Sequence, residues 1–484
     1  MRLPEILSVF GAGATVLRDG GQREPLGYSI DSRGVRAGEL FFAIQGANQD
    51  GHRFVADALA KGAIGAVVKR GFIGSPYAIG CGESTVIEVD DTLDALQRLA
   101  RAVLVGWRGK VIAITGSMGK TTTKEMTAAA LSCAGRVLKT VGNLNNEYGL
   151  PLSVLKMESD GASAADFDFA VLEMGMNHRG EIARLCEIAP PDVAVVTVVA
   201  PVHLEFFESV DEIAEAKSEI VRGAKRNGAA VLNADDRRVA QMASLRTDLE
   251  VRTFGIENEA DVAARDVESD GLSVTRFRLV TRGGETPCTL PLAGRHNVYN
   301  ALAAAAVADI FEVSPSEIAR ALGSAPGLKM RGEVIRFAAG FTVLDDSYNS
   351  NPHALIEMAR TLSSNRRATR RIVAAGEMLE LGASGPELHR ETGRQIALLG
   401  VDLLIGVRGL ARELVEGARE AGMQDEAAIF CETPNEAAEL IERKARRGDL
   451  ILVKGSRGVK TEIIVEKLKQ AFEQMGEASG PGSS

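Results

Sequence analysis

The length and charge of the chain exclude several classes of protein. Its 484 residues are too many for a single hydrophobic core, so about three domains are expected. A composition of 45% apolar and 25% charged residues is that of an ordinary globular protein. The net charge of −9, with no basic cluster, argues against nucleic-acid binding but leaves room for anionic small substrates at local basic groups.

Cysteine usage and apolar runs point to the cytoplasm. The five cysteines are scattered and form no C-x-x-C pair, which suits a reducing compartment and predicts neither a zinc site nor a disulfide framework. Gly11 and Gly13 break the first apolar stretch, which makes it a poor signal peptide. The most apolar run, 193–202, is too short to span a bilayer, so we expect no integral membrane contact.

Residues 1–107 predict a small α/β domain. Alternating and apolar runs indicate strands at 39–44 and 63–68 and helices at 53–61 and 92–105. The segment Trp107–Gly109 indicates a junction to the next domain.

Residues 108–327 alternate between strand and helix patterns, which is typical of a parallel sheet covered on both faces. The apolar, β-rich runs are 111–115, 169–174, 192–199 and 229–233. Further strand patterns at 251–254 and 273–280 predict extra strands at an edge. The alanine-rich segment 297–310 predicts a helix that closes this domain.

Residues 328–484 alternate again and predict a doubly wound, Rossmann-like sheet. Strands are expected at 341–345, 370–375, 401–407, 427–431 and 449–454. Helices are expected at 353–362, 386–399, 409–421 and 435–446. The Gly- and Ser-rich residues 475–484 predict a disordered tail.

The segment 115–122, Thr-Gly-Ser-Met-Gly-Lys-Thr-Thr, predicts a phosphate-binding loop. It follows an apolar strand and precedes a helix, so backbone N–H groups and the helix dipole would face one anion. Lys120 would add a point charge and the Thr121 hydroxyl a ligand for Mg²⁺. The usual longer loop has a glycine where this chain has Ile114, so this is a shorter form. A plain strand-to-helix turn would not call for these residues together.

Two side chains at expected strand ends are candidates for a magnesium site. Glu173 closes the apolar run 169–174, and His203 follows the run 192–199. Carboxyl ends of parallel strands meet at one edge of a sheet, and Mg²⁺ accepts a few protein ligands beside phosphate oxygens. Each residue also has an ordinary interpretation, Glu173 as an exposed strand end and His203 as a loop histidine.

Lys217 lies on the apolar face of an expected helix, because its neighbours three and four positions away are all apolar. A snorkelling side chain is the ordinary interpretation. The alternative is a buried, neutral amine that takes up CO₂ as a carbamate, an anionic oxygen ligand.

Ordered segments across the chain together resemble the Mur ligase family of ATP-dependent amide-bond ligases of peptidoglycan assembly. In the central domain they are 115–122, Glu-Met-Gly-Met-Asn-His-Arg-Gly-Glu-Ile (173–182), His-Leu-Glu (203–205), Ala-Lys-Ser-Glu-Ile (216–220), Asn-Ala-Asp-Asp (233–236) and His-Asn-Val-Tyr-Asn (296–300). In the last domain they are Arg331, Asp-Asp-Ser-Tyr-Asn-Ser-Asn-Pro (345–352), Gly-Glu-Met-Leu-Glu-Leu-Gly (376–382) and Lys-Gly-Ser-Arg (454–457).

The resemblance implies three domains with distinct tasks: residues 1–107 bind the UDP-sugar, 108–327 bind ATP, and 328–484 form a Rossmann-like domain. It implies catalytic roles for Lys120, His203 and Lys217, and an Mg²⁺ site of Thr121, Glu173, His203 and carbamylated Lys217. The implied ATP contacts are Thr115, Gly116, Ser117, Met118, Gly119, Lys120, Thr121, Thr122, Asn297, Asn300, Arg331 and Asp345. For Asn297 and Asn300, helix capping in an exposed first turn is the ordinary interpretation.

The resemblance also implies substrate contacts. On the uridine side they are Ser32, Arg33, Asn48, Asp50 and His52, although Asp31-Ser32-Arg33 by itself reads as a turn. Asn143, Asn145 and Asn146 would meet the pyrophosphate and muramoyl end, a task that suits amide donors but leaves a simple Asn-rich turn open. Tyr348, Asn349 and Asn351 are candidates for the side of the incoming amine.

Segments 177–182 and 345–352 resemble the branch of the family that joins D-alanyl-D-alanine to UDP-N-acetylmuramoyl-tripeptide through an acyl phosphate, with ATP and Mg²⁺ as cofactors. We expect this activity in a cytoplasmic monomer. Two alternatives stay open: a sister ligase that adds a single amino acid or glutamate, and a non-catalytic binder of UDP-sugars or nucleotides.

Overall fold

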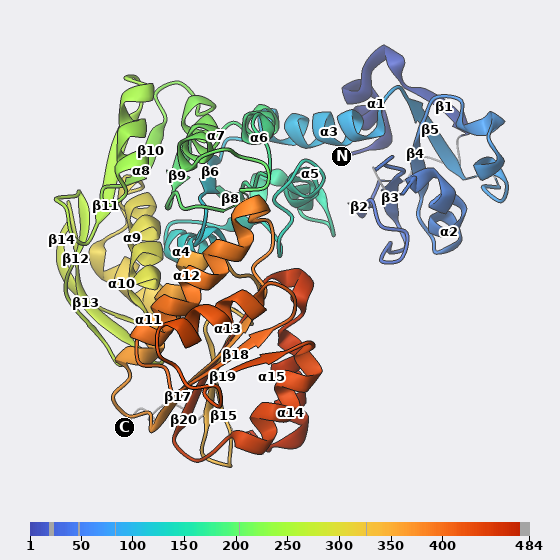
Figure 1. Ribbon diagram of the computed structural model, residues 1–484. Coiled ribbons are helices and arrows are strands. Elements are labelled where there is room, and N and C mark those ends of the chain that lie inside the picture. Colours follow the sequence, from blue (N-terminus) through green and yellow to red (C-terminus); the bar gives the residue numbers. More distant parts are fainter. Residues whose placement is uncertain (19–23, 47–48, 83, 203, 326, 475–484) are drawn as a thin grey trace, which may run out of the picture.

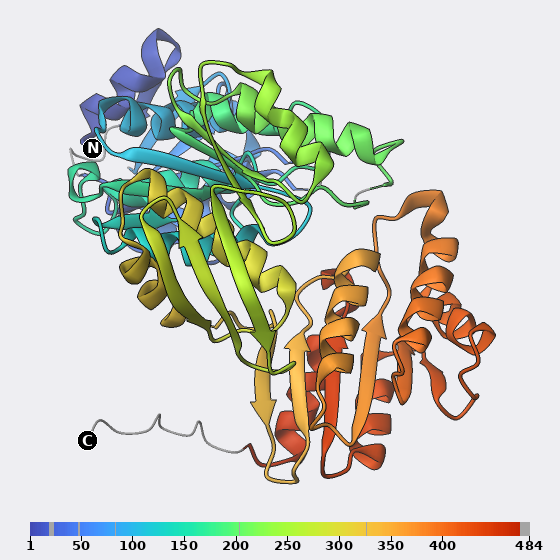
Figure 2. The same ribbon diagram turned by 90° about the vertical axis from the view of Figure 1, so that its left-hand side faces the viewer.

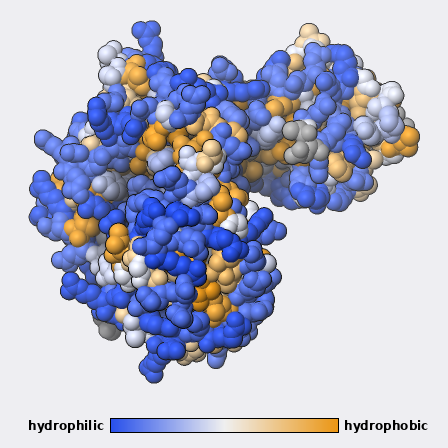
Figure 3. Space-filling view, in the orientation of Figure 1, coloured by the Kyte–Doolittle hydropathy of each residue, from blue (hydrophilic) through white to orange (hydrophobic). Residues whose placement is uncertain are grey.

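The computed structural model describes residues 1–18, 24–46, 49–82, 84–202, 204–325 and 327–474. Within them the chain forms three α/β domains around sheets of five, nine and six strands, which confirms the expected fold class. Figure 1 shows the N-terminal and C-terminal domains on different sides of the central domain. In the space-filling view the N-terminal domain is a separate lobe (Figure 3). The expected tail at 475–484 lies outside the described residues, as do Asn48 and His203.

The N-terminal domain is a sheet with strand order β1-β5-β4-β3-β2, parallel except where β1 pairs with β5. The structure confirms the strands expected at 39–44 and 63–68 and the helices expected at 53–61 and 92–105. It adds a first helix and three short strands that the sequence pattern did not reveal. Its elements are α1 (Leu3–Phe10), β1 (Thr15–Arg18), β2 (Gly27–Ser29), β3 (Glu39–Phe42), α2 (Val55–Ala60), β4 (Gly65–Lys69), β5 (Thr85–Val89) and α3 (Thr92–Gly106).

The central domain has the strand order β14-β13-β12-β11-β10-β9-β6-β8-β7. Its elements are β6 (Lys110–Thr115), α4 (Lys120–Leu131), β7 (Val137–Lys139), α5 (Gly149–Leu155), β8 (Phe169–Glu173), α6 (Glu181–Ile188), β9 (Val193–Val196), α7 (Val210–Arg222), β10 (Ala229–Asn233), α8 (Arg237–Gln241), β11 (Glu250–Gly255), β12 (Val262–Ser269), β13 (Thr275–Thr281), β14 (Gly284–Leu290), α9 (Arg295–Ile310) and α10 (Pro315–Gly323).

The expectation of a parallel sheet holds from β7 to β12 and needs a correction beyond it. There β13 pairs antiparallel with both β12 and β14, because tight turns rather than helical crossovers connect these strands. Figure 2 shows these long strands running toward the C-terminal domain. The helix expected at 297–310 is confirmed as α9, but α10 rather than α9 is the last helix of this domain.

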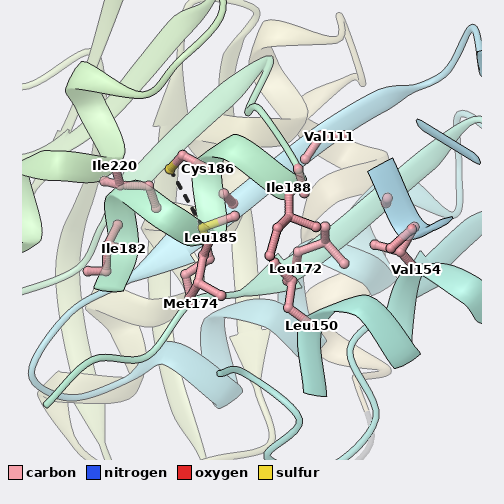
Figure 4. Close-up of a cluster of buried hydrophobic side chains, with 14 of the residues drawn as sticks. Val111, Leu150, Val154, Leu172, Met174, Ile182, Leu185, Cys186, Ile188 and Ile220 are labelled. Carbon is pink, nitrogen blue, oxygen red and sulfur yellow. Dashed lines mark hydrogen bonds between the residues drawn. The ribbon is translucent and has the colours of Figure 1, made fainter. Parts of the chain in front are cut away.

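The parallel strands of the central domain are buried on both faces, as their continuous apolar runs predict. Alternate residues of β6 show this: Val111 and Ala113 belong to one core, Ile112 and Ile114 to the other. The first core continues without a break into the N-terminal domain, because α3 contributes Leu96 to it. Figure 4 shows part of this core, where α6 packs over β8 with Cys186 against Met174.

The C-terminal domain has the strand order β15-β16-β20-β17-β18-β19, parallel except where β15 pairs with β16. Helices cover both faces, which confirms the expected doubly wound sheet. Its elements are β15 (Glu333–Arg336), β16 (Thr342–Asp346), α11 (Pro352–Ser364), β17 (Arg370–Gly376), α12 (Gly385–Leu398), β18 (Leu403–Val407), α13 (Ala411–Glu420), β19 (Ala428–Cys431), α14 (Pro434–Lys444), β20 (Asp449–Lys454) and α15 (Glu462–Ala471). In the described part of the chain, no helix has the length and apolar character needed to cross a bilayer.

Candidate active site between the central and C-terminal domains

A cavity of about 720 Å³ lies where the carboxyl ends of the central strands face the C-terminal domain. It is lined from the central domain by the segment after β6, the loop after β7 and the first turns of α9. From the C-terminal domain it is lined by Arg331 and by the loops after β16, β17 and β20. This is the place where open α/β sheets bind their ligands.

Close approach of the chain to its neighbours explains the glycines of the loop after β6. A Cβ at Gly116 would lie 1.9 Å from the Thr197 hydroxyl oxygen, and one at Gly119 would lie 2.2 Å from Asn300 Oδ1. Both glycines also have positive φ angles, and Gly119 is the N-cap of α4. The loop is held in place because Ser117 donates to the carbonyl oxygens of Val198 and Ala200, at 2.8 and 3.0 Å.

Lys120 begins α4 and lines the cavity. Its Nζ donates to the carbonyl oxygen of Gly116 at 2.7 Å, so the ammonium curls over the loop. Burial in the cleft lowers the pKa of Lys120, nearby Glu173 opposes this effect, and Arg331 adds to it. A cation at the N-terminus of α4 favours a polyphosphate at this spot.

Glu173 is 2% exposed, so the interpretation as an exposed strand end is wrong. Its carboxylate accepts hydrogen bonds from the Thr121 hydroxyl and from the Asn145 amide, both at 2.8 Å. The strand end of β8, the first turn of α4 and the loop after β7 therefore meet at one carboxylate. Thr121 and Glu173 offer oxygen atoms as metal ligands, which Mg²⁺ prefers.

Lys217 on α7 is 2% exposed, which excludes a snorkelling side chain. Burial pushes the pKa of its amine well below the ordinary value, and the charge of Lys120 pushes it in the same direction. The amine is therefore biased toward the neutral form, in which it is a nucleophile.

Asn297 and Asn300 are each 6% exposed, so the exposed-turn interpretation is wrong for both. The N-cap of α9 is Gly294, and the Asn297 amide instead donates to the carbonyl oxygen of Ala293 at 2.8 Å. Across the cavity the Arg331 guanidinium lies over the Tyr348 ring, 4.0 Å from its centroid. All four side chains line the cavity.

Some expected ATP contacts lie behind the cavity wall. The Thr115 hydroxyl donates to the carbonyl oxygen of Met174 at 2.8 Å, and Asp345 accepts from the Ser347 hydroxyl at 2.6 Å. Neither residue lines the cavity, and the next residue, Asp346, does so with its partner Lys454. Burial raises the pKa of Asp345 to about 6, with the Ser347 hydrogen bonds opposing this shift.

The residues expected on the substrate side fall into two groups. Asn143, Asn145, Asn146, Tyr348, Asn349 and Asn351 all line the cavity. Two of these asparagines also have local tasks: the Asn146 side chain accepts from the backbone N–H of Gly149, and Asn351 caps α11.

The group expected on the uridine side lies in the N-terminal domain, outside the cavity. Arg33 is exposed and pairs with Asp31, while Ser32 is buried and its carbonyl oxygen accepts from Lys61. His52 uses both ring nitrogens within the domain: Nδ1 lies 2.6 Å from Asp50, and Nε2 accepts from the backbone N–H of Lys69.

Several cavity residues received no role from the sequence. Asp235 accepts from the Tyr299 hydroxyl at 2.8 Å and from three backbone N–H groups, and these bonds lower its pKa against the opposing effect of burial. Lys454 is the last residue of β20, and Arg457 lies in the segment that follows it. The sequence could have pointed to them, because Asp235, Tyr299, Lys454 and Arg457 all belong to segments that carry the family resemblance. Their residue types alone did not indicate a task for any of them.

A phosphate-binding loop at the carboxyl end of a strand in a parallel sheet, facing a second α/β domain across a cavity, is the arrangement of an enzyme that uses a nucleoside triphosphate. Family models match the chain in three stretches: the Mur ligase family catalytic domain at residues 26–103, the Mur ligase middle domain at 114–308, and the Mur ligase glutamate ligase domain at 330–457. The chain belongs to the Mur ligase family of ATP-dependent peptide ligases.

Several similar proteins belong to one branch of this family. The chain is 35% identical to the UDP-N-acetylmuramoyl-tripeptide–D-alanyl-D-alanine ligase of Bacillus subtilis, over 91% of this chain and 93% of that protein. A crystal structure of MurF from Acinetobacter baumannii is 32% identical, with a TM-score of 0.82 over 93% of this chain and 94% of that chain. The MurF ligase of Thermotoga maritima, solved in complex with ADP, is 29% identical with a TM-score of 0.78, over 92% and 97%.

Proposed function

We propose that this protein joins D-alanyl-D-alanine to UDP-N-acetylmuramoyl-tripeptide, with conversion of ATP to ADP and phosphate, in the cytoplasmic synthesis of peptidoglycan precursors. The observation that carries the proposal is the shared cavity, which brings the phosphate loop and Glu173 opposite Arg331, Tyr348 and the loop after β20. The named relatives supply the substrates. We propose that the three domains span residues 1–107, 108–327 and 328–484.

The nucleotide occupies the central wall of the cavity in this proposal. Backbone N–H groups of residues 118–122 and the Lys120 ammonium hold the β- and γ-phosphates. Asn297, Asn300 and Arg331 contact the adenosine in this proposal, since all three line the same cavity as the phosphate loop. Asp345 acts from behind the wall, because its side chain orders Ser347.

The donor set fits Mg²⁺, because Thr121 and Glu173 already place a hydroxyl and a buried carboxylate within 2.8 Å of each other beside Lys120. These two residues and His203 would hold the ion, which would neutralise phosphate charge. Lys217 would add a carbamate: its neutral amine attacks CO₂, an N–C bond forms, and a proton leaves to solvent. The buried position and lowered pKa of Lys217 support this step.

The proposed reaction has two steps. The terminal carboxylate of the tripeptide attacks the γ-phosphorus, ADP leaves, and an acyl phosphate forms. Lys120 and the loop N–H groups stabilise the charge that moves with the phosphoryl group. The free amine of the dipeptide then attacks the acyl carbon, and phosphate leaves from the tetrahedral intermediate.

In this proposal separate groups of residues position the UDP-linked tripeptide and the dipeptide. Asn143, Asn145 and Asn146 face the pyrophosphate and muramoyl end, while Ser32, Arg33, Asp50 and His52 hold the uridine side from the N-terminal domain. Tyr348, Asn349 and Asn351 face the dipeptide. ATP contacts on two domains imply that closure completes the site and excludes water.

The test is phosphate release by the purified protein with UDP-N-acetylmuramoyl-tripeptide, D-alanyl-D-alanine and Mg-ATP. We expect release that requires all three and gives a pentapeptide product. Release no faster than in the absence of the dipeptide overturns the proposal. A panel of free amino acids and glutamate runs alongside, and preference for one of these would make the protein a sister ligase instead.

A further inference from the structure

Lys124 is a buried cation to which the proposed reaction gives no task. It lies on α4, one turn after Thr121, and its side chain is 1% exposed. A lysine is almost never buried so completely without partners, because its charge is costly to desolvate. Its partners therefore indicate what the residue does.

The Lys124 ammonium binds the loop after β7. Its Nζ donates to the carbonyl oxygen of Thr140 at 2.7 Å and lies 3.5 Å from that of Gly142. The charge is balanced by Glu125, 3.1 Å away, which also pairs with Lys139. One cation thus spans two carbonyl oxygens at the start of the loop that carries Asn143, Asn145 and Asn146.

The same loop holds Glu173. The Thr140 hydroxyl accepts from the backbone N–H of Glu173 at 3.0 Å, and the Asn145 amide donates to its carboxylate at 2.8 Å. The backbone N–H of Gly175 donates to the carbonyl oxygen of Asn145 at 2.9 Å. Helix α4 therefore makes two contacts here: Thr121 binds the Glu173 carboxylate, and Lys124 binds the loop after β7.

We propose that Lys124 is a positioning residue that fixes the 140–146 loop, so that its asparagines face the anionic UDP-linked substrate and Asn145 holds Glu173. The identity of that substrate rests on the proposed function. Without the ammonium, two carbonyl oxygens lose their buried donor and the loop is free to leave the carboxylate. Groups that orient a binding residue from behind are commonly worth a factor of ten or more in affinity or activity.

The first test is independent of turnover. Hydrogen exchange is measured on the full chain for the parent and for Lys124→Met, which keeps the length of the side chain but removes the donor. The amides of Leu144 and Asn145, both hydrogen-bonded within the loop, should exchange roughly tenfold faster or more in the variant, with the β6 amides unchanged. Unchanged exchange at these two amides overturns the proposal.

The second test uses steady-state kinetics. Lys124→Met should raise the KM for UDP-N-acetylmuramoyl-tripeptide about tenfold and leave the KM for D-alanyl-D-alanine within about twofold. Lys139→Met is the matched control, since it removes the other partner of Glu125 without touching the loop carbonyls, and it should change neither constant. Equal effects of both variants, or equal rises in both KM values, contradict a positioning role.

A third variant separates positioning from charge balance and covers poor folding of the single substitution. Lys124→Met with Glu125→Gln removes both charges of the buried pair. If Lys124 only neutralised Glu125, the double variant would recover the parent KM, and that recovery overturns the proposal. Retention of the raised KM supports it. If the parent itself shows no turnover, the proposed function fails while the exchange experiment still decides the role of Lys124.

Discussion

The two walls of the cavity are built differently. On the central wall, loop and strand ends are tied within one domain by bonds such as Ser117 to Ala200 and Lys120 to Gly116. On the C-terminal wall, side chains join loops that follow three separate strands: Ser456 donates to the carbonyl oxygen of Ser350 and accepts from the backbone N–H of Leu379.

The shape of the two cavity walls therefore has different structural origins. The central wall is built around one strand-loop-helix segment, whereas the C-terminal wall is assembled from loops that follow three strands of the other domain. Hydrogen bonds that cross between the domains include Glu205 N–H to the carbonyl oxygen of Glu380, at 3.3 Å, and the Asn365 amide to that of Asp270, at 3.1 Å. We therefore expect chemistry to depend on the central wall and nucleotide affinity to depend on both.

The largest effect is expected from Lys120→Ala on the central wall. Loss of the cation that faces the moving phosphoryl group should lower kcat about a thousandfold, or about 4 kcal/mol in the barrier. Phosphate release measures it. Lys110→Ala, at the start of the strand β6 that precedes the phosphate loop, is the control and should keep the parent rate. A variant as active as the parent would remove the phosphate cradle from the mechanism.

Asp345→Asn tests the C-terminal wall through the pH dependence of stability. The pKa of Asp345 is raised to about 6, so its folded form binds a proton that the unfolded form releases. The resulting stabilisation is complete below about pH 4 and lost as the pH rises through about 6, about 3 kcal/mol in all. The midpoint of thermal unfolding should therefore fall less for the variant than for the parent between pH 4 and 6.5.

The control for this titration is Asp425→Asn, an exposed residue of the same domain, which should follow the parent. Parallel pH profiles for Asp345→Asn and the parent would show that Asp345 does not titrate in this range.

Lys217→Met tests the proposed carbamate on α7 of the central domain, where Lys217 is buried and is not one of the residues that line the cavity. We expect kcat to fall about a hundredfold, or about 2.7 kcal/mol, since the substitution would remove the proposed carbamate ligand. Protein equilibrated with ¹³C-bicarbonate should show a carbamate carbon signal that the variant lacks and that Lys225→Met, an exposed control, retains. A parent without this signal would refute the carbamate.

Arg331→Met is expected to have the smallest effect and bears most directly on the comparison. The variant would lose the proposed contact of the Arg331 guanidinium with the adenosine, so the KM for ATP should rise about tenfold, or about 1.4 kcal/mol, with kcat changed less. Arg336→Met, exposed on β15, is the control. A fall in kcat as large as that of Lys120→Ala would mean that the two walls do not divide the work as proposed.

Apolar runs in the sequence predicted the inner strands of the central sheet well, but they did not reveal several strands at the edges of the sheets. Apolar runs identified β6, β8, β9 and β10, because a strand buried on both faces must be apolar throughout. The short strands β1, β2 and β7 escaped notice, since three or four residues are too few to show a period.

Among site residues, the phosphate loop was readable because glycine, lysine and threonine at that spacing have a local physical reason. Glu173 and the asparagines of α9 were ambiguous, because burial depends on what packs against them from elsewhere in the chain. Lys124 was overlooked for the same reason: its partners Thr140 and Gly142 are 16 and 18 residues away along the chain.

By itself the sequence determined the three-domain α/β class, the phosphate loop and the family, because each of these depends on periodicity or on motifs that are local along the chain. Only the tertiary structure decided which carboxylate lies behind the cavity wall and which lines it, Asp345 against Asp346. Successive residues of a strand point to opposite faces of the sheet, and which face meets the cavity is set by the packing of the whole domain.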